Sequence, residues 1–259
     1  ALHLRGGVHL KQIYGAPPID LGMVDLSPTE MMCWLYCPVK LPGSRLSVPP
    51  NLEQFKPILL MVMADCAERW VESYVYITAK RLFVTPEGLM NRPGWHSDGF
   101  MTEDLNYIWC DTSPTVFWEP ESCVRFVQDH NLSLIEMEAT CEPDTYHHRV
   151  YPLKHLLRLD EAVMHKMAPV KQPGFRTFVK VSVSEHEYRL SGNSINHDLA
   201  PHWAYVARQE GRNAPEVLET HEQAATSAQA HPALPSQSAT APKATPESAG
   251  SNHTKEGME

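Results

Sequence analysis

Short runs of hydrophobic residues, separated by turns rich in glycine and proline, dominate most of the chain. The clearest run covers residues 175–183, where aromatic and β-branched residues recur with few interruptions. Runs of the same kind occur at residues 71–84, 105–110, 115–118 and 162–167. Many short strands at close spacing are typical of a sandwich or jelly roll, so we expect a mainly β fold with flanking helices.

Three hydrophobic segments do not reveal their secondary structure by pattern alone. Residues 31–37 are dense in apolar side chains and fit either a buried strand or a short helix. Residues 150–159 carry apolar side chains at both odd and even positions, which leaves them ambiguous. Residues 132–137 have the composition of a further strand, and we interpret them as a candidate strand.

The composition of the chain changes after about residue 213. Residues 222–246 consist mostly of Ala, Pro, Ser and Thr, and they offer almost no apolar surface to bury. Such a segment cannot offset the entropy lost on ordering, so we expect it to be disordered. The sequence therefore predicts one folded domain over residues 1–212 and a disordered, acidic tail over residues 213–259.

Charge and cysteine usage narrow the functional classes. The formal net charge is −9, and a mildly acidic body argues against non-specific nucleic-acid binding, which needs a basic surface. The six cysteines are scattered without a CxxC pair, which favours free thiols in a cytoplasmic protein over disulfides or zinc. The longest apolar stretch, residues 58–64, is far too short to cross a membrane, and no signal peptide is evident. We therefore expect a cytoplasmic protein without a membrane partner.

The first candidate for chemistry is the pair His96 and Asp98, which follows a turn at residues 85–88. In a strand, side chains two residues apart point to the same face, so an imidazole nitrogen and a carboxylate oxygen converge there. These are two of the three ligands of the 2-His-1-carboxylate triad that holds non-haem Fe(II). A His-x-Asp pair is common by chance, so the interpretation depends on a third ligand further along the chain.

We prefer His165 as that third ligand. It lies near the end of a short apolar run, and Pro169 ends the run because proline cannot donate to a strand ladder. A turn at residues 171–174 then leads to Arg176 at the start of the next strand. Two neighbouring strands joined in this way bring the histidine and the arginine to the same rim of a sheet.

A second placement remains open, in which His147 or His148 is the ligand and Arg158 binds an anion. Arg158 lies in the middle of a segment, between leucines, so this option matches a strand–turn–strand unit less well. Each residue also has an ordinary structural explanation, such as a surface hydrogen bond, a core histidine or a solvent-facing charge. The metal site is favoured because order, spacing and strand context agree.

With these residues in order, residues 71–196 resemble the Fe(II)/2-oxoglutarate-dependent oxygenase superfamily. The matching pattern is the His-x-Asp pair, a distal histidine and an arginine about ten residues later, here His96, Asp98, His165 and Arg176. The resemblance implies a double-stranded β-helix, a cupin-like jelly roll, that binds Fe(II), 2-oxoglutarate and O₂. It also implies that Arg176 holds the far carboxylate of 2-oxoglutarate, a task that suits a bidentate guanidinium.

The sequence departs from the superfamily at one position. Some members carry Ser or Thr two residues after the arginine, whereas this chain carries Phe178. A hydroxyl from another strand, such as that of Tyr107 or Thr115, would have to replace it. Tyr107 and Trp109 follow the His-x-Asp pair where a pocket-lining strand is expected, so we consider both as candidate cofactor-binding residues.

Two alternatives belong to other functional classes. A cupin-like jelly roll can hold a divalent metal for an isomerase or another reaction without 2-oxoglutarate, and Arg176 has no role there. A non-catalytic binding protein could retain the fold and lose the metal, although an intact His-x-Asp pair argues against it. The sequence does not specify a substrate, a macromolecular partner or an oligomeric state.

Overall fold

The computed structural model describes residues 13–88, 93–199 and 203–208. All of them lie in residues 1–218, the larger of the two units into which the chain divides. The predicted tail, residues 213–259, lies outside the described residues. No helix in the described part of the chain is long and apolar enough to cross a membrane.

The larger of two sheets has six strands in the order β1-β8-β5-β10-β3-β2, and every neighbouring pair is antiparallel. Its strands are β1 (Ile19–Met23), β2 (Trp34–Lys40), β3 (Tyr74–Val84), β5 (Leu105–Cys110), β8 (His155–Leu159) and β10 (Gly174–Ser184). β10 pairs with β3 along its whole length. The strands predicted within residues 71–84, 105–110 and 175–183 are confirmed.

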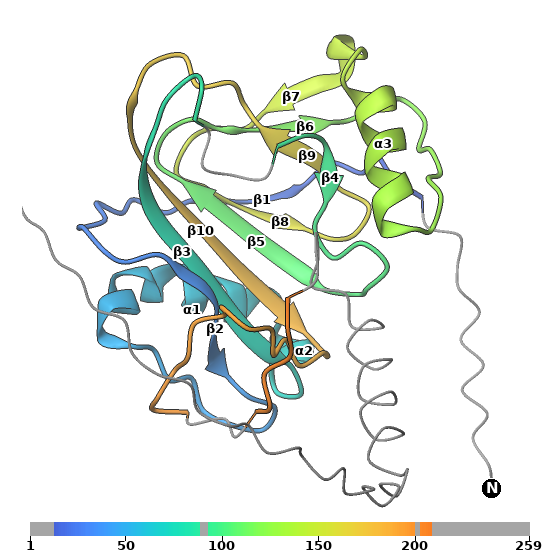
Figure 1. The fold of residues 1–259 in the computed structure, drawn as a ribbon. Coiled ribbons are helices and arrows are strands. Elements are labelled where there is room, and N and C mark those ends of the chain that lie inside the picture. The colour runs from blue at the N-terminus through green and yellow to red at the C-terminus, as the bar shows by residue number, and fades with distance from the viewer. Residues whose placement is uncertain (1–12, 89–92, 200–202, 209–259) are drawn as a thin grey trace, which may run out of the picture. The chain divides into compact units, whose positions relative to one another are not determined.

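The smaller sheet has four antiparallel strands in the order β4-β9-β6-β7. They are β4 (His96–Ser97), β6 (Thr115–Trp118), β7 (His148–Val150) and β9 (Met164–Met167). From β3 to β10 the chain passes back and forth between the sheets, and only β6 and β7 are consecutive strands of the same sheet (Figure 1). The described residues therefore form a mainly β structure of two antiparallel sheets.

Helical segments flank these sheets. The 3-10 helix η1 (Pro50–Phe55) leads into α1 (Lys56–Asp65) and α2 (Ala67–Trp70), while α3 (His130–Cys141) and the 3-10 turn η2 (Thr145–His147) precede β7. The strand interpretation of residues 132–137 is wrong, because these residues lie within α3. Asp129 caps this helix by accepting hydrogen bonds from the backbone N–H groups of Asn131 and Leu132, each at 2.9 Å. The helix then buries Ser133, Met137 and Cys141 at four-residue spacing.

The undecided segments are also resolved. Residues 31–37 enter β2, which begins at Trp34. Residues 150–159 belong to two strands, because β7 ends at Val150 and β8 begins at His155. Lys154 between them has a φ of 64°, a left-handed conformation that turns the chain and explains the mixed apolar pattern.

The alternation of side chains across the large sheet determines which residues face the space between the sheets. Odd-numbered residues of β5 and β10, such as Tyr107, Trp109 and Val181, pack in a core cluster with Leu59 and Val62 of α1. Even-numbered residues of the same strands point to the opposite face, as the period of two requires. The small sheet lies over that opposite face, and the functional site is found there.

Candidate metal centre and its cavity

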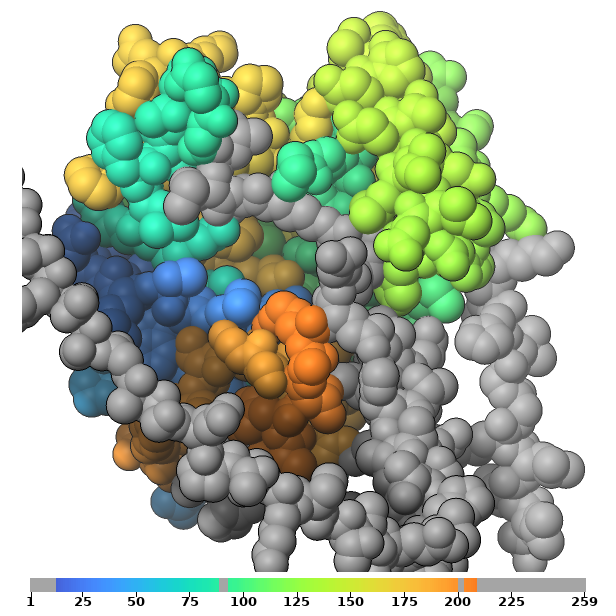
Figure 2. All heavy atoms as spheres, viewed as in Figure 1, coloured from blue at the N-terminus to red at the C-terminus, as the bar shows by residue number. Residues whose placement is uncertain are grey.

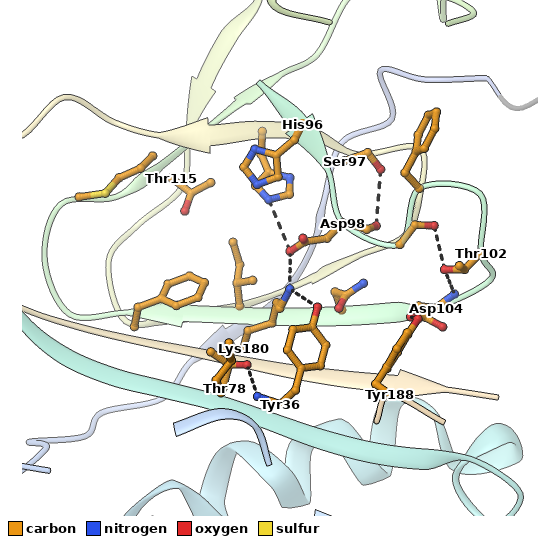
Figure 3. Close-up of a pocket in the computed structure, with 18 of the residues that line it drawn as sticks. Tyr36, Thr78, His96, Ser97, Asp98, Thr102, Asp104, Thr115, Lys180 and Tyr188 are labelled. Atoms are coloured by element: carbon orange, nitrogen blue, oxygen red, sulfur yellow. Dashed lines mark hydrogen bonds and ion pairs between the residues drawn. The ribbon is translucent and has the colours of Figure 1, made fainter. Parts of the chain in front are cut away.

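His96, Asp98 and His165 converge between the two sheets. His96 on β4 is the direct register partner of His165 on β9, and their ring centroids are 4.5 Å apart. His165 Nε2 lies 3.7 Å from Asp98 Oδ2. Each of the three residues offers one potential ligand atom, an imidazole nitrogen or a carboxylate oxygen, and these three atoms lie within 4.8 Å of one another (Figure 3). No other group of three potential ligands meets this criterion among the described residues.

Backbone carbonyl groups orient both imidazoles. The Nδ1 of His96 lies 2.9 Å from the carbonyl oxygen of Gly94, and that of His165 lies 3.3 Å from the carbonyl oxygen of Val163. A carbonyl oxygen only accepts, so each Nδ1 donates in this contact and each Nε2 is left to bind a metal once it is unprotonated. Metal-binding histidines are commonly fixed by such a second hydrogen bond.

Asp98 is held as a carboxylate by the cations around it. Burial would raise the pKa of Asp98, but the positive charge of Lys180 and the charges of His165 and His96 together lower it well below its usual range. Lys180 contributes most, since its Nζ lies 3.2 Å from Asp98 Oδ2. Two imidazoles and an ionised carboxylate thus face one point, a donor set that suits a divalent transition metal.

Gly99 permits the turn that follows Asp98. It has a φ of +78°, and a Cβ at this position would lie 3.2 Å from Asp104 Cβ and 3.3 Å from Asn106 Nδ2. A side chain would therefore strain the backbone and crowd two neighbours at once. The glycine sets the direction in which the chain leaves the candidate ligand.

We expect Gly99→Ala to lower the free energy of unfolding by ~2 kcal/mol and to weaken divalent-metal binding several-fold. Urea denaturation and a Mn(II) titration measure the two effects. Gly192→Ala is the matched control, since Gly192 has a φ of +88° but nothing within 4 Å of an added Cβ. Equal effects of the two substitutions would mean that crowding at Gly99 does not matter.

A cavity of ≈ 490 Å³ extends from the three candidate ligands across the large sheet. Its floor carries Arg176, Phe178 and Lys180 of β10, which share one face of that strand. Its other lining residues include Lys80, Asn106, Ile108, Thr115, Met167, Tyr36, Asp104, Tyr188 and Arg208. Figure 2 shows the molecule as spheres in the view of Figure 1, with residues after β10 (orange) beside the segment around β2 (blue). The two segments are hydrogen-bonded, since the N–H of Ser194 donates to the carbonyl oxygen of Leu35 at 2.7 Å and the N–H of Leu35 donates to Ser194 Oγ at 2.9 Å.

Arg176 is buried in this floor with its guanidinium anchored at one end. Its Nε donates to the carbonyl oxygens of Thr112 and Ser113, at 3.1 and 2.9 Å, and its guanidinium carbon lies 5.0 Å from the ring centroid of Phe178. No carboxylate among the described residues forms an ion pair with it. Burial lowers the pKa of Arg176, although such a group remains a cation at neutral pH. The thiol of Cys110 also interacts with the guanidinium, and the terminal N–H groups that remain are suited to receive an anion from the cavity.

The hydroxyl of Tyr107 or Thr115 was expected to replace the Ser or Thr that is absent at Phe178. Thr115 lines the cavity, but Tyr107 does not. The prediction that Tyr107 and Trp109 bind a cofactor is wrong, because both side chains point to the face of β5 away from the cavity. The hydroxyl of Tyr107 donates to Asp65 Oδ2 at 2.8 Å, and Trp109 Nε1 donates to two backbone carbonyls at 3.0 Å. Their even-numbered neighbours Asn106 and Ile108 face the cavity instead.

Tyr107→Phe tests this structural assignment. Loss of the hydrogen bond to Asp65 should lower the free energy of unfolding by about 1 kcal/mol, while Arg158, 2.9 Å from the same carboxylate oxygen, stays in place. Metal and 2-oxoglutarate affinities should remain at wild-type values in calorimetric titrations. A selective loss of 2-oxoglutarate affinity would instead return Tyr107 to the cofactor-binding residues.

The alternative distal ligands lie away from His96 and Asp98. His147 Nδ1 contacts the carboxylate of Asp144 at 2.8 Å, and His148 Nε2 contacts the carbonyl oxygen of Cys141 at 2.8 Å. Neither histidine lines the cavity, and neither does Arg158. The structure brings together His165 and Arg176, the preferred pair.

Lys180 and Tyr36 are among the cavity residues that the sequence did not reveal. Lys180 shares the parity of Arg176 on the same strand, so the period of two could have placed it in the floor. Tyr36 gave no such signal: its φ is 45°, within an irregular stretch of β2, and this strained backbone places its ring in the cavity wall.

Comparisons with known proteins add no identification. No protein-family model, curated protein or solved structure was found to match the chain.

Proposed function

We propose that the protein is a non-haem Fe(II)- and 2-oxoglutarate-dependent oxygenase built on a double-stranded β-helix. The order of the strands supports the fold: β3 to β10 supply four neighbouring strands of the large sheet and all four of the small sheet. A jelly roll consists of two such facing antiparallel sheets. β1 and β2 would then be additions at the two edges of the large sheet.

The residues present fit a bound Fe(II) ion. Two histidines with oriented Nε2 atoms and one carboxylate match the 2-His-1-carboxylate donor set, which leaves further coordination positions open. The three side chains come from β4, β9 and the turn after β4, so the sheet itself holds them in place. When bound, the iron would supply chelation of the keto acid and activation of O₂.

The observation that carries the proposal is that Arg176 opens onto the same cavity as the three candidate ligands. 2-Oxoglutarate has a metal-chelating keto acid at one end and a carboxylate at the other. A buried guanidinium that forms no ion pair among the described residues is well suited to fix that second carboxylate through charge-assisted hydrogen bonds. Phe178 occupies the position where some superfamily members carry Ser or Thr, and Thr115 lines the same cavity and would supply a hydroxyl in its place.

The chain's own residues would orient the cosubstrate and exclude water. Arg176 fixes one end, and Phe178 and Ile108 provide apolar surface along the floor. Lys180 and the two imidazoles keep Asp98 ionised and therefore able to bind a cation. Such a dry, preorganised cavity is the protein's usual contribution to cofactor chemistry.

Turnover without an added substrate tests this function. Many such reactions proceed slowly on 2-oxoglutarate alone, so the purified protein with Fe(II) should consume O₂ and form succinate above the rate of iron without protein. Asp98→Ala should abolish the protein-dependent rate. Absence of succinate from a protein that binds both Fe(II) and 2-oxoglutarate would favour a metal enzyme of another class.

A further inference from the structure

The floor of the cavity has two cationic positions separated by apolar side chains. Arg176 and Lys180 lie four residues apart on the same face of β10, and Phe178 lies between them. On the neighbouring strand, Ile108 is the register partner of Lys180 and also lines the cavity. If Arg176 binds the cosubstrate, Lys180 marks a second anionic subsite closer to the metal centre.

Lys180 lies at the junction of the metal centre and the cavity wall. Its Nζ is 3.2 Å from Asp98 Oδ2 and donates a hydrogen bond of 3.1 Å to the hydroxyl oxygen of Tyr36 (Figure 3). An ammonium group has three donors, so these contacts leave one N–H for a further acceptor. A metal ion on Asp98 would also draw on the negative charge that Lys180 now neutralises.

The charge of the cavity favours an anionic ligand in addition to the cosubstrate. Lys180 Nζ lies 3.2 Å from Asp98 Oδ2, so the carboxylate of Asp98 now balances the charge of this lysine. A divalent metal bound to Asp98 would take over that carboxylate charge. An anionic ligand beside Lys180 would then replace the lost counter-charge, which a neutral or cationic ligand would not do.

We propose that Lys180 anchors the carboxylate of a small monocarboxylic acid, which is the substrate of the reaction; this inference rests on the proposed oxygenase function. Because Lys180 Nζ contacts a candidate metal ligand, a carboxylate bound there places its neighbouring C–H groups beside the metal. Asp104 lies further along the cavity, where Tyr188 donates a hydrogen bond of 2.5 Å to its Oδ2 and burial raises the pKa of its carboxyl group. A second acidic group on the substrate would face this acidic side chain, which disfavours it.

Hexanoate and its neutral counterpart hexanamide are suitable probes. With the protein saturated in Mn(II) and 2-oxoglutarate, so that the Arg176 end is occupied, calorimetry should show that hexanoate binds about tenfold more tightly than hexanamide, since one ligand is charged. Lys180→Met should remove this preference and give both probes similar affinity. Lys56→Met, at an exposed lysine paired with Glu53, should leave the preference unchanged.

The ratio of the two affinities separates substrate recognition from a structural role. If Lys180 only supports Asp98, Lys180→Met weakens both probes equally or not at all, and the carboxylate preference persists; that result overturns the proposal. Equal binding of the two probes to the wild type also overturns it. Circular dichroism and thermal unfolding establish that the variant is folded.

The proposed function and this inference fail separately. If the wild type binds Mn(II) and 2-oxoglutarate but shows no Lys180-dependent preference, the oxygenase proposal stands and the subsite does not exist. If the wild type binds neither Mn(II) nor 2-oxoglutarate, the oxygenase proposal fails, and the metal-free protein is titrated with hexanoate and hexanamide. A preference for hexanoate that Lys180→Met abolishes would support an acid-binding cavity. Equal binding of the two probes would overturn the subsite as well.

Discussion

Asp98→Ala should reduce the affinity for Fe(II) or Mn(II) by at least about a hundredfold, because the substitution removes a metal ligand and not merely a residue that orients one. Asp98 provides the only carboxylate of the candidate triad, and cations on several sides keep it ionised. Titration with Mn(II), followed by water-proton relaxation or calorimetry, gives the affinity. Circular dichroism checks that Lys180, which loses its ion-pair partner, does not unfold the protein.

Asp25→Ala is the control for this experiment. Asp25 forms an exposed ion pair with Lys154 at 2.6 Å and does not line the cavity, so its loss should leave metal affinity unchanged. His96→Ala and His165→Ala should each resemble Asp98→Ala. Wild-type metal affinity in any of the three folded variants would remove that residue from the site.

Arg176→Met should raise the concentration of 2-oxoglutarate needed for half-saturation by at least about a hundredfold, while metal affinity stays near the wild-type value. Two charge-assisted hydrogen bonds are lost, each contributing ~1.5–3 kcal/mol. Arg176→Lys keeps the charge but not the planar fork, so it should recover only part of the affinity. Titration of the Mn(II)-loaded protein with 2-oxoglutarate measures both variants.

Arg81→Met is the matched control for Arg176. Arg81 lies on the neighbouring strand, contacts Asp111 at 3.6 Å and Thr177 Oγ1 at 3.0 Å, and does not line the cavity. Its replacement should leave 2-oxoglutarate affinity unchanged. Unchanged affinity in Arg176→Met would mean that another cation, such as Lys80 or Lys180, binds the far carboxylate.

The sequence predicted strands of both sheets well where their composition reflects their burial. Residues 105–110 and 115–118 are rich in β-branched and aromatic side chains, and they form β5 and β6 with the predicted bounds. His165 and Arg176 line the same cavity, but the expectation that neighbouring strands bring them to one rim of a sheet is wrong. β9 with His165 belongs to the small sheet and β10 with Arg176 to the large sheet, so the two side chains meet across the space between the sheets.

The sequence did not reveal which face of β5 points into the cavity. A period of two gives two equivalent faces, and both faces of this strand are buried, one against α1 and one against the small sheet. Polarity therefore did not distinguish Tyr107 and Trp109 from Asn106 and Ile108. Tertiary packing alone decides between them.

Long-range contacts explain the remaining differences. β1 pairs with β8, with Ile19 opposite Arg158, and nothing local in residues 19–23 predicts that partner. Tyr36 reaches the cavity through a positive φ that its own sequence disfavours. The contact between Lys180 and Asp98 joins β10 of the large sheet to the turn after β4, which a pattern read along one strand does not show.

Anaerobic titration with Fe(II) and then 2-oxoglutarate tests the central claim most directly. The proposal predicts a broad visible charge-transfer band that requires both additions, disappears in Asp98→Ala and needs far more 2-oxoglutarate in Arg176→Met. Stoichiometric Fe(II) binding without such a band at any 2-oxoglutarate concentration would contradict the proposal, because the keto acid would then not chelate the metal.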